Sequence, residues 1–327
     1  MDENLQNNEP EKIPEHKDDE EQNPARVDYS NKLNPLISPL SAAFIGLFGG
    51  FFLYQIVGGV LTLLIFGLNV EKAPVNGLRL MTMAGQVLFI LLPALVFSKW
   101  FYEDVTTVIR FKPARWKEIG LFVIGIIILT PLLQNFVVIQ NYFFDKLAAS
   151  SSTIHSVKSL FDSLNEKVET TYSNLITAHS VPEGLLVILV VAGVPAVCEE
   201  VMFRGFIQKS FELRFKPYLA ILITSVFFGL YHFNPYGLIP LAALGFYFGF
   251  AAYISDSIFT SMSLHFLNNF VAIIMFFIAG SEQIMSPASD SAVDLKSAIT
   301  MFIPLLVIFS GVIYLIIKYY GDKKNYV

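Results

Sequence analysis

Long apolar segments separated by short polar ones make up most of this chain. A helix that crosses a membrane needs roughly 20 apolar residues, and eight segments come close to that length or exceed it. They are 39–68, 80–100, 118–142, 183–206, 217–233, 236–255, 257–280 and 298–319. The fifth is the shortest, and the first is long enough to tilt or break. The pattern predicts an all-α fold, a polytopic membrane helical bundle with about eight transmembrane helices.

Composition along the chain predicts five parts. The first 30 residues contain ten Asp or Glu against three Lys or Arg, and such a segment cannot bury enough apolar surface to order itself. We therefore expect residues 1–35 to be a disordered acidic cytoplasmic tail, which aids solubility or docks a partner. The other expected parts are the N-terminal transmembrane helices at 36–142, an extramembrane loop at 143–182, a core at 183–280, and a last transmembrane helix with a C-terminal tail at 281–327.

The loop at 143–182 has a helical pattern of its own. Apolar residues recur in it at spacings of three and four, as on one face of a helix: Val157, Leu160, Phe161, Leu164, Val168, Tyr172 and Leu175. This spacing predicts an amphipathic helix, and three placements are open. The helix lies on the outer membrane surface, packs on the outer ends of the spans, or forms a lid over a site.

The charged residues support a membrane protein and predict its orientation in the bilayer. Only 15% of the residues are charged, against about 25% in ordinary globular domains. With eight spans, fifteen Lys and Arg fall on the side of the two termini and six on the other, which predicts cytoplasmic termini. The lipid bilayer is thus an expected partner. Nucleic acid is not, because no basic patch with interleaved aromatic residues occurs.

Two adjacent carboxylates and a guanidinium interrupt the fourth apolar segment. Each charge at the centre of a membrane helix costs about 2.5–3.5 kcal/mol on insertion scales, so the group indicates either chemistry or a structural network. Glu200 and Arg204 are one helical turn apart and can pair, whereas Glu199 points about 100° away. We expect Arg204 to hold Glu200 ionised and Glu199 to face a cavity as a general base. The structural alternative is an ion-pair network that fixes helix register.

Two more polar pairs lie in later apolar segments, again one helical turn apart. Phe228 precedes His232 by four residues, and His265 precedes Asn269 by four. Each pair alone is explained as well by hydrogen bonds between membrane helices, which His and Asn commonly make. The three pairs together predict that one carboxylate, two imidazoles and one amide face a common interior point.

This set of side chains fits two kinds of hydrolytic centre. In a centre without a metal, Glu199 and His232 would activate water, while His265 and Asn269 would stabilise the oxyanion. In a metal centre, Glu199, His232 and His265 would bind zinc or another divalent ion. The sequence lacks the His-Glu-x-x-His motif of common zinc peptidases and the Gly-x-Ser-x-Gly elbow of serine hydrolases.

The ordered trio of motifs resembles a known family. Glu-Glu-x-x-x-Arg at 199–204, Phe-x-x-x-His at 228–232 and His-x-x-x-Asn at 265–269 look like those of the CPBP family. This family comprises CAAX prenyl endopeptidases of the Ras-converting-enzyme type and bacteriocin-processing relatives. The resemblance covers roughly residues 183–280. It implies an intramembrane endopeptidase with an all-helical core that opens to the cytoplasmic side, in a bacterial plasma membrane.

The resemblance also implies roles for the residues already singled out. Glu199 and His232 would correspond to the water-activating pair, and His265 and Asn269 to the oxyanion-stabilising pair. Glu200 and Arg204 would support them. Family members are described both as metalloproteases and as glutamate-dependent, and this residue set fits either mechanism. The implied substrate is a membrane-associated peptide or protein, such as a prenylated CAAX protein or a leader peptide.

Two other functions remain open from the sequence. The first is a catalytically silent membrane protein for bacteriocin immunity or for scaffolding a partner, although all three motifs are intact here. The second is a transporter that uses the charged helix as an ion or proton relay. A transporter of this kind predicts inverted repeats, and the first half of the chain contains no second Glu-Glu-x-x-x-Arg segment.

Overall fold

The structure, a computed structural model, describes residues 33, 35–279 and 291–324. Nearly all of the predicted tail at 1–35 thus lies outside the described residues. Within them the chain is helical and contains no strand, which confirms the all-α prediction. The α-helices are α1 Pro39–Phe51, α2 Gly58–Phe66, α3 Val75–Gln86, α4 Leu92–Tyr102, α5 Val105–Val108, α6 Trp116–Ser150, α7 Ser152–Ile176, α8 Val181–Val187, α9 Val194–Glu200, α10 Gln208–Glu212, α11 Pro217–Leu230, α12 Leu238–Ser255, α13 Ile258–Ala279 and α15 Ser291–Lys324.

Seven continuous helical runs among the described residues are long and apolar enough to cross a membrane. They are Pro39–Phe66, Val75–Tyr102, Trp116–Ser150, Val181–Glu212, Leu238–Ser255, Ile258–Ile278 and Leu295–Gly321. The eighth predicted segment is α11, which has 14 residues and is therefore about 21 Å long. This is less than the roughly 30 Å of a bilayer's hydrocarbon core. The protein is an integral membrane protein, and its described residues contain seven helical runs long enough to span a bilayer, with α11 too short to do so alone.

Four π-helical segments interrupt the long runs without ending them. They are η2 Phe52–Val57, η4 Val87–Leu91, η5 Ile188–Gly193 and η6 Val201–Ile207. The first, η2, begins shortly after Gly49-Gly50, near the middle of the first predicted span. This span therefore passes from α-helix to π-helix and back without a break. Wider π turns often occur at functional sites, and the interrupted runs are the three that carry or contact the Glu199-Glu200 doublet.

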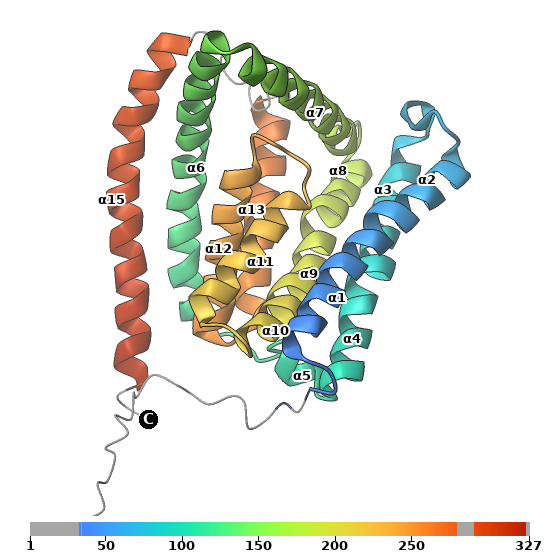
Figure 1. The fold of residues 1–327 in the computed structure, drawn as a ribbon, viewed down its shortest axis with the longest axis vertical. Helices are drawn as coiled ribbons and strands as arrows, with labels where there is room; N and C mark the ends of the chain where they lie inside the picture. Colours follow the sequence, from blue (N-terminus) through green and yellow to red (C-terminus); the bar gives the residue numbers. More distant parts are fainter. Residues whose placement is uncertain (1–32, 34, 280–290, 325–327) are drawn as a thin grey trace, which may run out of the picture.

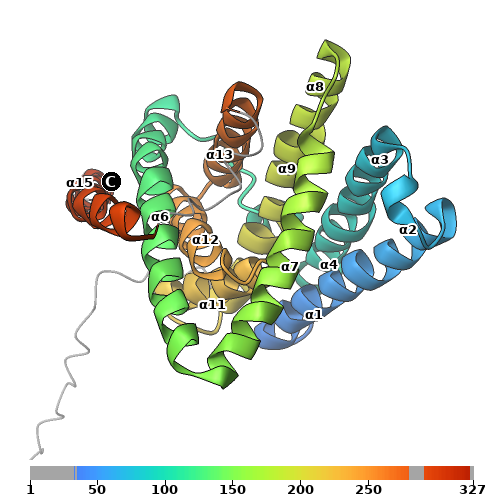
Figure 2. The same ribbon diagram turned by 90° about the horizontal axis from the view of Figure 1, so that it is seen from above.

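The ends of the bundle differ in what covers them. In Figure 1, α1 begins and α15 ends at the same end, while α7 lies at the opposite end. Figure 2 shows α7 crossing over the bundle from the end of α6 toward α8. Ser151 separates α6 from α7, and its side chain accepts a hydrogen bond from the Ile154 backbone N–H at 3.5 Å. The segment predicted as a loop at 143–182 therefore contains the end of α6 and the whole of α7.

Two large apolar clusters fill the bundle and meet at one place. One joins α1, α4, η6, α10 and α11 and includes Phe206 and Phe228. The other joins α6, α12, α13 and α15 and includes Phe122 and Phe248. α11 packs tightly on α12, because a Cβ at Gly229 would lie 2.8 Å from the Leu238 carbonyl oxygen. Arg204 and His265 of the motifs lie between Phe228 of the first cluster and Phe248 of the second.

Candidate active site

Glu200, Arg204 and His265 form a closed, buried cluster. Glu200 ends α9, Arg204 follows one turn later in η6, and His265 comes from α13. The Glu200 Oε1 atom is 3.0 Å from Arg204 Nη1 and 2.8 Å from His265 Nδ1. Because all three residues are at most 4% exposed, the charges compensate one another away from solvent. The predicted Glu200–Arg204 ion pair is present, and His265 joins it.

Arg204 is satisfied on its other side by a backbone carbonyl and an aromatic ring. Its Nη2 donates to the Gly245 carbonyl oxygen at 3.2 Å, and its Cζ lies 4.2 Å from the Phe228 ring centroid. This distance is favourable for a cation–π interaction. A Cβ at position 245 would lie 3.0 Å from Phe228 Cδ1, so the close approach of α12 requires glycine there.

Phe228 also orients the two imidazoles. Its ring centroid is 4.8 Å from that of His232 and 6.0 Å from that of His265. Phe248 stacks on His265 from the second apolar cluster, at 5.3 Å and an interplanar angle of 21°. The two apolar clusters thus hold the rings of the site between them, which restricts the rotamers of both His residues.

His232 lies in the turn that follows α11. Its Nδ1 is 2.7 Å from the Phe228 carbonyl oxygen. A carbonyl can only accept a hydrogen bond, so Nδ1 carries the proton and a neutral ring presents a lone pair at Nε2. The next residue, Phe233, has a φ of 50°, which is an uncommon conformation for a bulky residue. Tyr231 fixes the turn from the other side, because its hydroxyl donates to the Leu47 carbonyl oxygen of α1.

Glu199 faces a different neighbourhood from Glu200. It is half-buried, and its Oε1 accepts a hydrogen bond from Gln86 Nε2 of α3 at 3.1 Å. The sequence analysis missed Gln86, although a signal was present: it is a lone amide within the apolar run 83–97. Its side chain is directed across the helix interface to the carboxylate that was proposed as the base.

Asn269 connects α13 to the π-helical segment η5. Its Nδ2 donates to the Val191 carbonyl oxygen at 3.0 Å, and its Oδ1 accepts from Asn268 Nδ2 at 3.2 Å. Asn268 contacts a neighbouring helix, since its Oδ1 accepts from the Thr130 hydroxyl of α6 at 3.4 Å. Asn269 retains a second amide hydrogen for a further acceptor.

The structure brings some of the predicted residues together and leaves one apart. Glu200, Arg204 and His265 are in direct contact. His232 interacts electrostatically with both Glu199 and His265, which places these three in one neighbourhood. Asn269 lies one helical turn from His265 and bonds to η5 instead of to the charged cluster.

The side-chain positions bear on the predicted metal centre in two ways. Among the residues that the structure describes, no group of three or more His, Cys, Asp or Glu is placed to hold an ion. The His265 Nδ1 bonds to Glu200 and the His232 Nδ1 to a carbonyl, and such bonds leave each Nε2 available, as in many metal-binding His residues. The ligand role of Glu199, His232 and His265 therefore stays a prediction.

Comparison with protein families identifies this part of the chain. Residues 181–271 match the family described as type II CAAX prenyl endopeptidase Rce1-like. The chain contains an Rce1-like domain. The matched range includes all three motifs, which confirms the family resemblance inferred from them, and the match supports a CAAX-type intramembrane endopeptidase at the level of the family. No curated protein and no solved structure matches the chain.

Several contacts to the Rce1-like domain come from outside the matched range. Gln86 of α3 is one of them. Arg79, also from α3 and 1% exposed, bonds instead to the end of α7, which lies outside the matched range: its Nε donates to the Leu175 carbonyl oxygen at 2.9 Å and its Nη2 to that of Thr177. It therefore caps the C-terminal end of α7. Tyr172 of α7 interacts electrostatically with Glu199.

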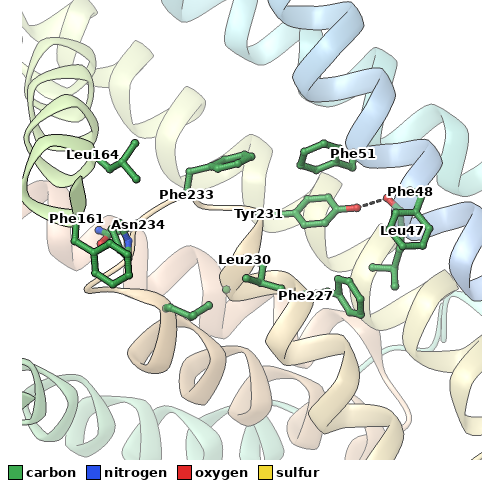
Figure 3. A pocket seen from close by; sticks show the side chains of 13 residues that line it. Leu47, Phe48, Phe51, Phe161, Leu164, Phe227, Leu230, Tyr231, Phe233 and Asn234 are labelled. Atoms are coloured by element: carbon green, nitrogen blue, oxygen red, sulfur yellow. Dashed lines mark hydrogen bonds between the residues drawn. The ribbon is translucent and has the colours of Figure 1, made fainter. Parts of the chain in front are cut away.

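An apolar cavity of about 500 Å³ lies beside the Rce1-like domain's His232 turn. Figure 3 shows side chains from α1, α7, α11 and this turn around it. Tyr231 and Phe233 line the cavity, but His232 between them does not. The cavity thus borders the site across the turn and does not lie over Glu199. Its lining residues are Leu47, Phe48, Phe51, Phe161, Leu164, Phe227, Gly229, Leu230, Tyr231, Phe233, Asn234, Pro235 and Leu238.

Proposed function

We propose that this protein is an intramembrane endopeptidase in which Glu199 is the general base. One observation carries the proposal, the different surroundings of two adjacent carboxylates. Glu200 is completely buried and bonded to Arg204 and His265, whereas Glu199 is half-buried and accepts a hydrogen bond from a neutral amide. A carboxylate that is not bonded to a cation can take up a proton during a reaction, as a general base must.

In the proposed mechanism Glu199 and His232 activate a water molecule. Glu199 accepts one proton of the water, and the lone pair at His232 Nε2 accepts a hydrogen bond from it. The water oxygen then attacks the carbonyl carbon of the scissile peptide bond and forms a tetrahedral intermediate. As the C–N bond breaks, Glu199 returns the proton to the leaving amine, so the products are a carboxylic acid and an amine.

His265 and Asn269 stabilise the oxyanion of this intermediate in our proposal. Asn269 contributes its second amide hydrogen. His265 donates through Nε2–H when its ring carries both protons, a form that the hydrogen bond from its Nδ1 to Glu200 favours. Donors that are aimed beforehand at a developing charge are worth about 10²–10³ in rate each. Glu200 and Arg204 act through His265, as positioning residues.

The substrate we propose is a membrane-associated peptide that carries an apolar chain. The cavity beside the His232 turn is lined mainly by aromatic and aliphatic side chains, which suit an isoprenoid or other lipid chain. A peptide bond close to the lipidated residue would then lie on the Glu199 side of the turn. A matched pair of peptides, with and without the lipid, tests this: the lipidated one should have the lower KM.

Glu199→Gln tests the proposed function directly. It keeps the size of the side chain and the bond to Gln86 but cannot accept a proton, so cleavage should slow by about 10²–10⁴-fold. The purified variant should still unfold at the wild-type temperature in detergent. Cleavage at the wild-type rate would refute the assignment, and a folded wild-type protein that cleaves no lipidated peptide would favour a catalytically silent role. A chelator should leave the wild-type rate unchanged.

A further inference from the structure

A second, smaller hollow lies between the first two membrane spans. It has a volume of about 180 Å³ and lies between η2 and α2 on one side and α3 on the other. Unlike the apolar cavity, it contains several polar side chains. Its lining residues are Tyr54, Gln55, Gly58, Gly59, Thr62, Leu78, Met81, Thr82 and Gly85. We call it the α2–α3 crevice.

The lining of the crevice is unusual for its position. Hydroxyl and amide groups within membrane spans are costly unless they bond to protein or to water. Here Gln55 donates to the Tyr231 carbonyl oxygen at 3.4 Å and Thr62 to that of Gly58 at 2.9 Å, and both side chains still line the crevice. Position 59 faces open space, since a Cβ at Gly59 would have no atom within 4 Å. With roughly 30 Å³ per water molecule, the crevice has room for about six.

The inner end of the crevice reaches the proposed base. Tyr54 lines the crevice and interacts electrostatically with Gln86 and Glu199. Gly85, another lining residue, directly precedes Gln86 in α3. The Gln86 Nε2 donates to Glu199, while its Oε1 is buried and accepts no hydrogen bond from any described residue. A buried acceptor of this kind is a position where ordered water is expected.

We propose that the α2–α3 crevice is a water-binding site that supplies the hydrolytic water to Glu199. This proposal rests on the proposed function, because peptide hydrolysis consumes one water molecule for each bond cleaved and the hydrocarbon core contains almost none. The apolar cavity is a poor route for water, since its lining is mainly aromatic and aliphatic. Substrate and water thus reach the site by separate routes on either side of the η2 segment.

Thiol labelling tests the hydration of the crevice without any assay of activity. The chain has one cysteine, the buried Cys198, so Cys198→Ala provides a background for single introduced cysteines. In this background Thr82→Cys should react with a charged, water-soluble methanethiosulfonate at least about tenfold faster than Leu80→Cys, because the reactive thiolate needs water. Leu80 is on the same helix and 50% exposed. Equal rates at the two positions would overturn the proposal.

Filling the crevice tests whether its water is used in the reaction. Gly59→Leu places a side chain in the open space, while Gly59→Ala adds only one methyl group. Gly59→Leu should slow the labelling of Thr82→Cys and, with Cys198 restored, lower kcat at least about fivefold with KM unchanged. The Ala variant should remain close to the wild type in both measurements.

The outcomes separate this proposal from the proposed function. If Gly59→Leu blocks labelling but leaves kcat unchanged, the crevice does not supply the reaction and the proposal is wrong. If Glu199→Gln remains active, the proposed function fails, whatever the labelling shows. A protein with an inactive Glu199→Gln variant, rapid labelling at position 82 and a slow Gly59→Leu variant supports both.

Discussion

The two carboxylates of the doublet belong to two different regions of the molecule. Glu200 lies in a closed region, where Arg204, His265 and Phe228 satisfy one another at the junction of two apolar clusters. Glu199 lies in an open region, next to Gln86, the α2–α3 crevice and the C-terminal part of α7. One step along a helix therefore separates a buried, paired carboxylate from the half-buried one that we propose as the general base.

The two regions are also formed by different parts of the sequence. Every residue of the closed cluster lies within the Rce1-like domain, at 181–271. The open region is completed from outside it, by α3 and α7. Within the domain, Phe228 contacts both imidazoles, while the bond from Tyr231 to Leu47 of α1 ties the His232 turn to the first span. The surroundings of Glu199 depend more strongly on segments outside the domain, through Gln86 of α3 and Tyr172 of α7.

Removing the guanidinium of the closed region should have the largest effect on stability. In Arg204→Met, Glu200 remains buried without its cation, and breaking a buried ion pair in this way costs about 3–5 kcal/mol. We expect a much lower unfolding temperature in detergent and loss of cleavage at the same time. Glu199→Gln should lose cleavage alone. If Arg204→Met unfolded at the wild-type temperature, the distinction between a structural and a reactive carboxylate would be wrong.

Helical periodicity made the closed region partly predictable. The Glu200–Arg204 pair and the Phe228–His232 contact are one turn apart in sequence, and local helix geometry alone places such residues on one face. The eight apolar segments could also be predicted, because each depends only on consecutive residues. They correspond to the seven long spans and to α11, whose 14 residues are too few to span a bilayer alone.

The contacts between helices were not predictable in this way. Glu200 and His265 are 65 positions apart, and Gln86 and Glu199 are 113 apart. No periodicity within one helix encodes such pairings, because they depend on how the helices pack and rotate against each other. The spacing in the sequence paired His265 with Asn269. The structure shows that the His265 Nδ1 bonds to Glu200 instead. For α7, the apolar stripe predicted a helix but could not distinguish its three placements.

A substitution at Gln86 tests the open region, and we expect it to have a smaller effect than Arg204→Met. Gln86→Met is nearly isosteric but lacks the N–H that bonds to Glu199. Hydrogen bonds to charged groups contribute about 1.5–3 kcal/mol, so we expect kcat to fall about tenfold or more. KM should not change, because Gln86 is 6% exposed and is not proposed to contact substrate. Steady-state kinetics on a lipidated peptide would show this.

The same variant distinguishes a positioning role from a structural one. Met removes the bond to Glu199 together with an amide oxygen that is buried without a described partner. The two losses act on stability in opposite directions, so we expect only a small change in unfolding temperature. A fall in stability that parallels the fall in kcat would indicate that Gln86 only holds α3 against α9. A change in KM with unchanged kcat would place Gln86 in substrate binding instead.

A substitution outside both regions should have the smallest effect on stability and serves as a reference for the other variants. Asp104 caps α5, where its carboxylate accepts from the Thr107 hydroxyl at 2.6 Å, the Thr107 backbone N–H at 3.0 Å and the Thr106 hydroxyl at 2.8 Å. These bonds, led by that of the Thr107 hydroxyl, lower the pKa of Asp104 from 3.8 to about 2. Asp104→Ala should cost about 1 kcal/mol at neutral pH, with cleavage unchanged.

The pH dependence of this cost has a definite sign. Because the pKa of Asp104 is lower in the folded state, the stabilisation is complete above pH 3.8 and is lost as the pH falls through about 2. The difference in unfolding temperature between wild type and Asp104→Ala should therefore shrink on acidification, measured at neutral pH and at about pH 3. Asp104→Asn, which caps without a charge, should keep a constant difference from Asp104→Ala. If the wild type kept its full advantage over Asp104→Ala in acid, the ionised cap would not be its source.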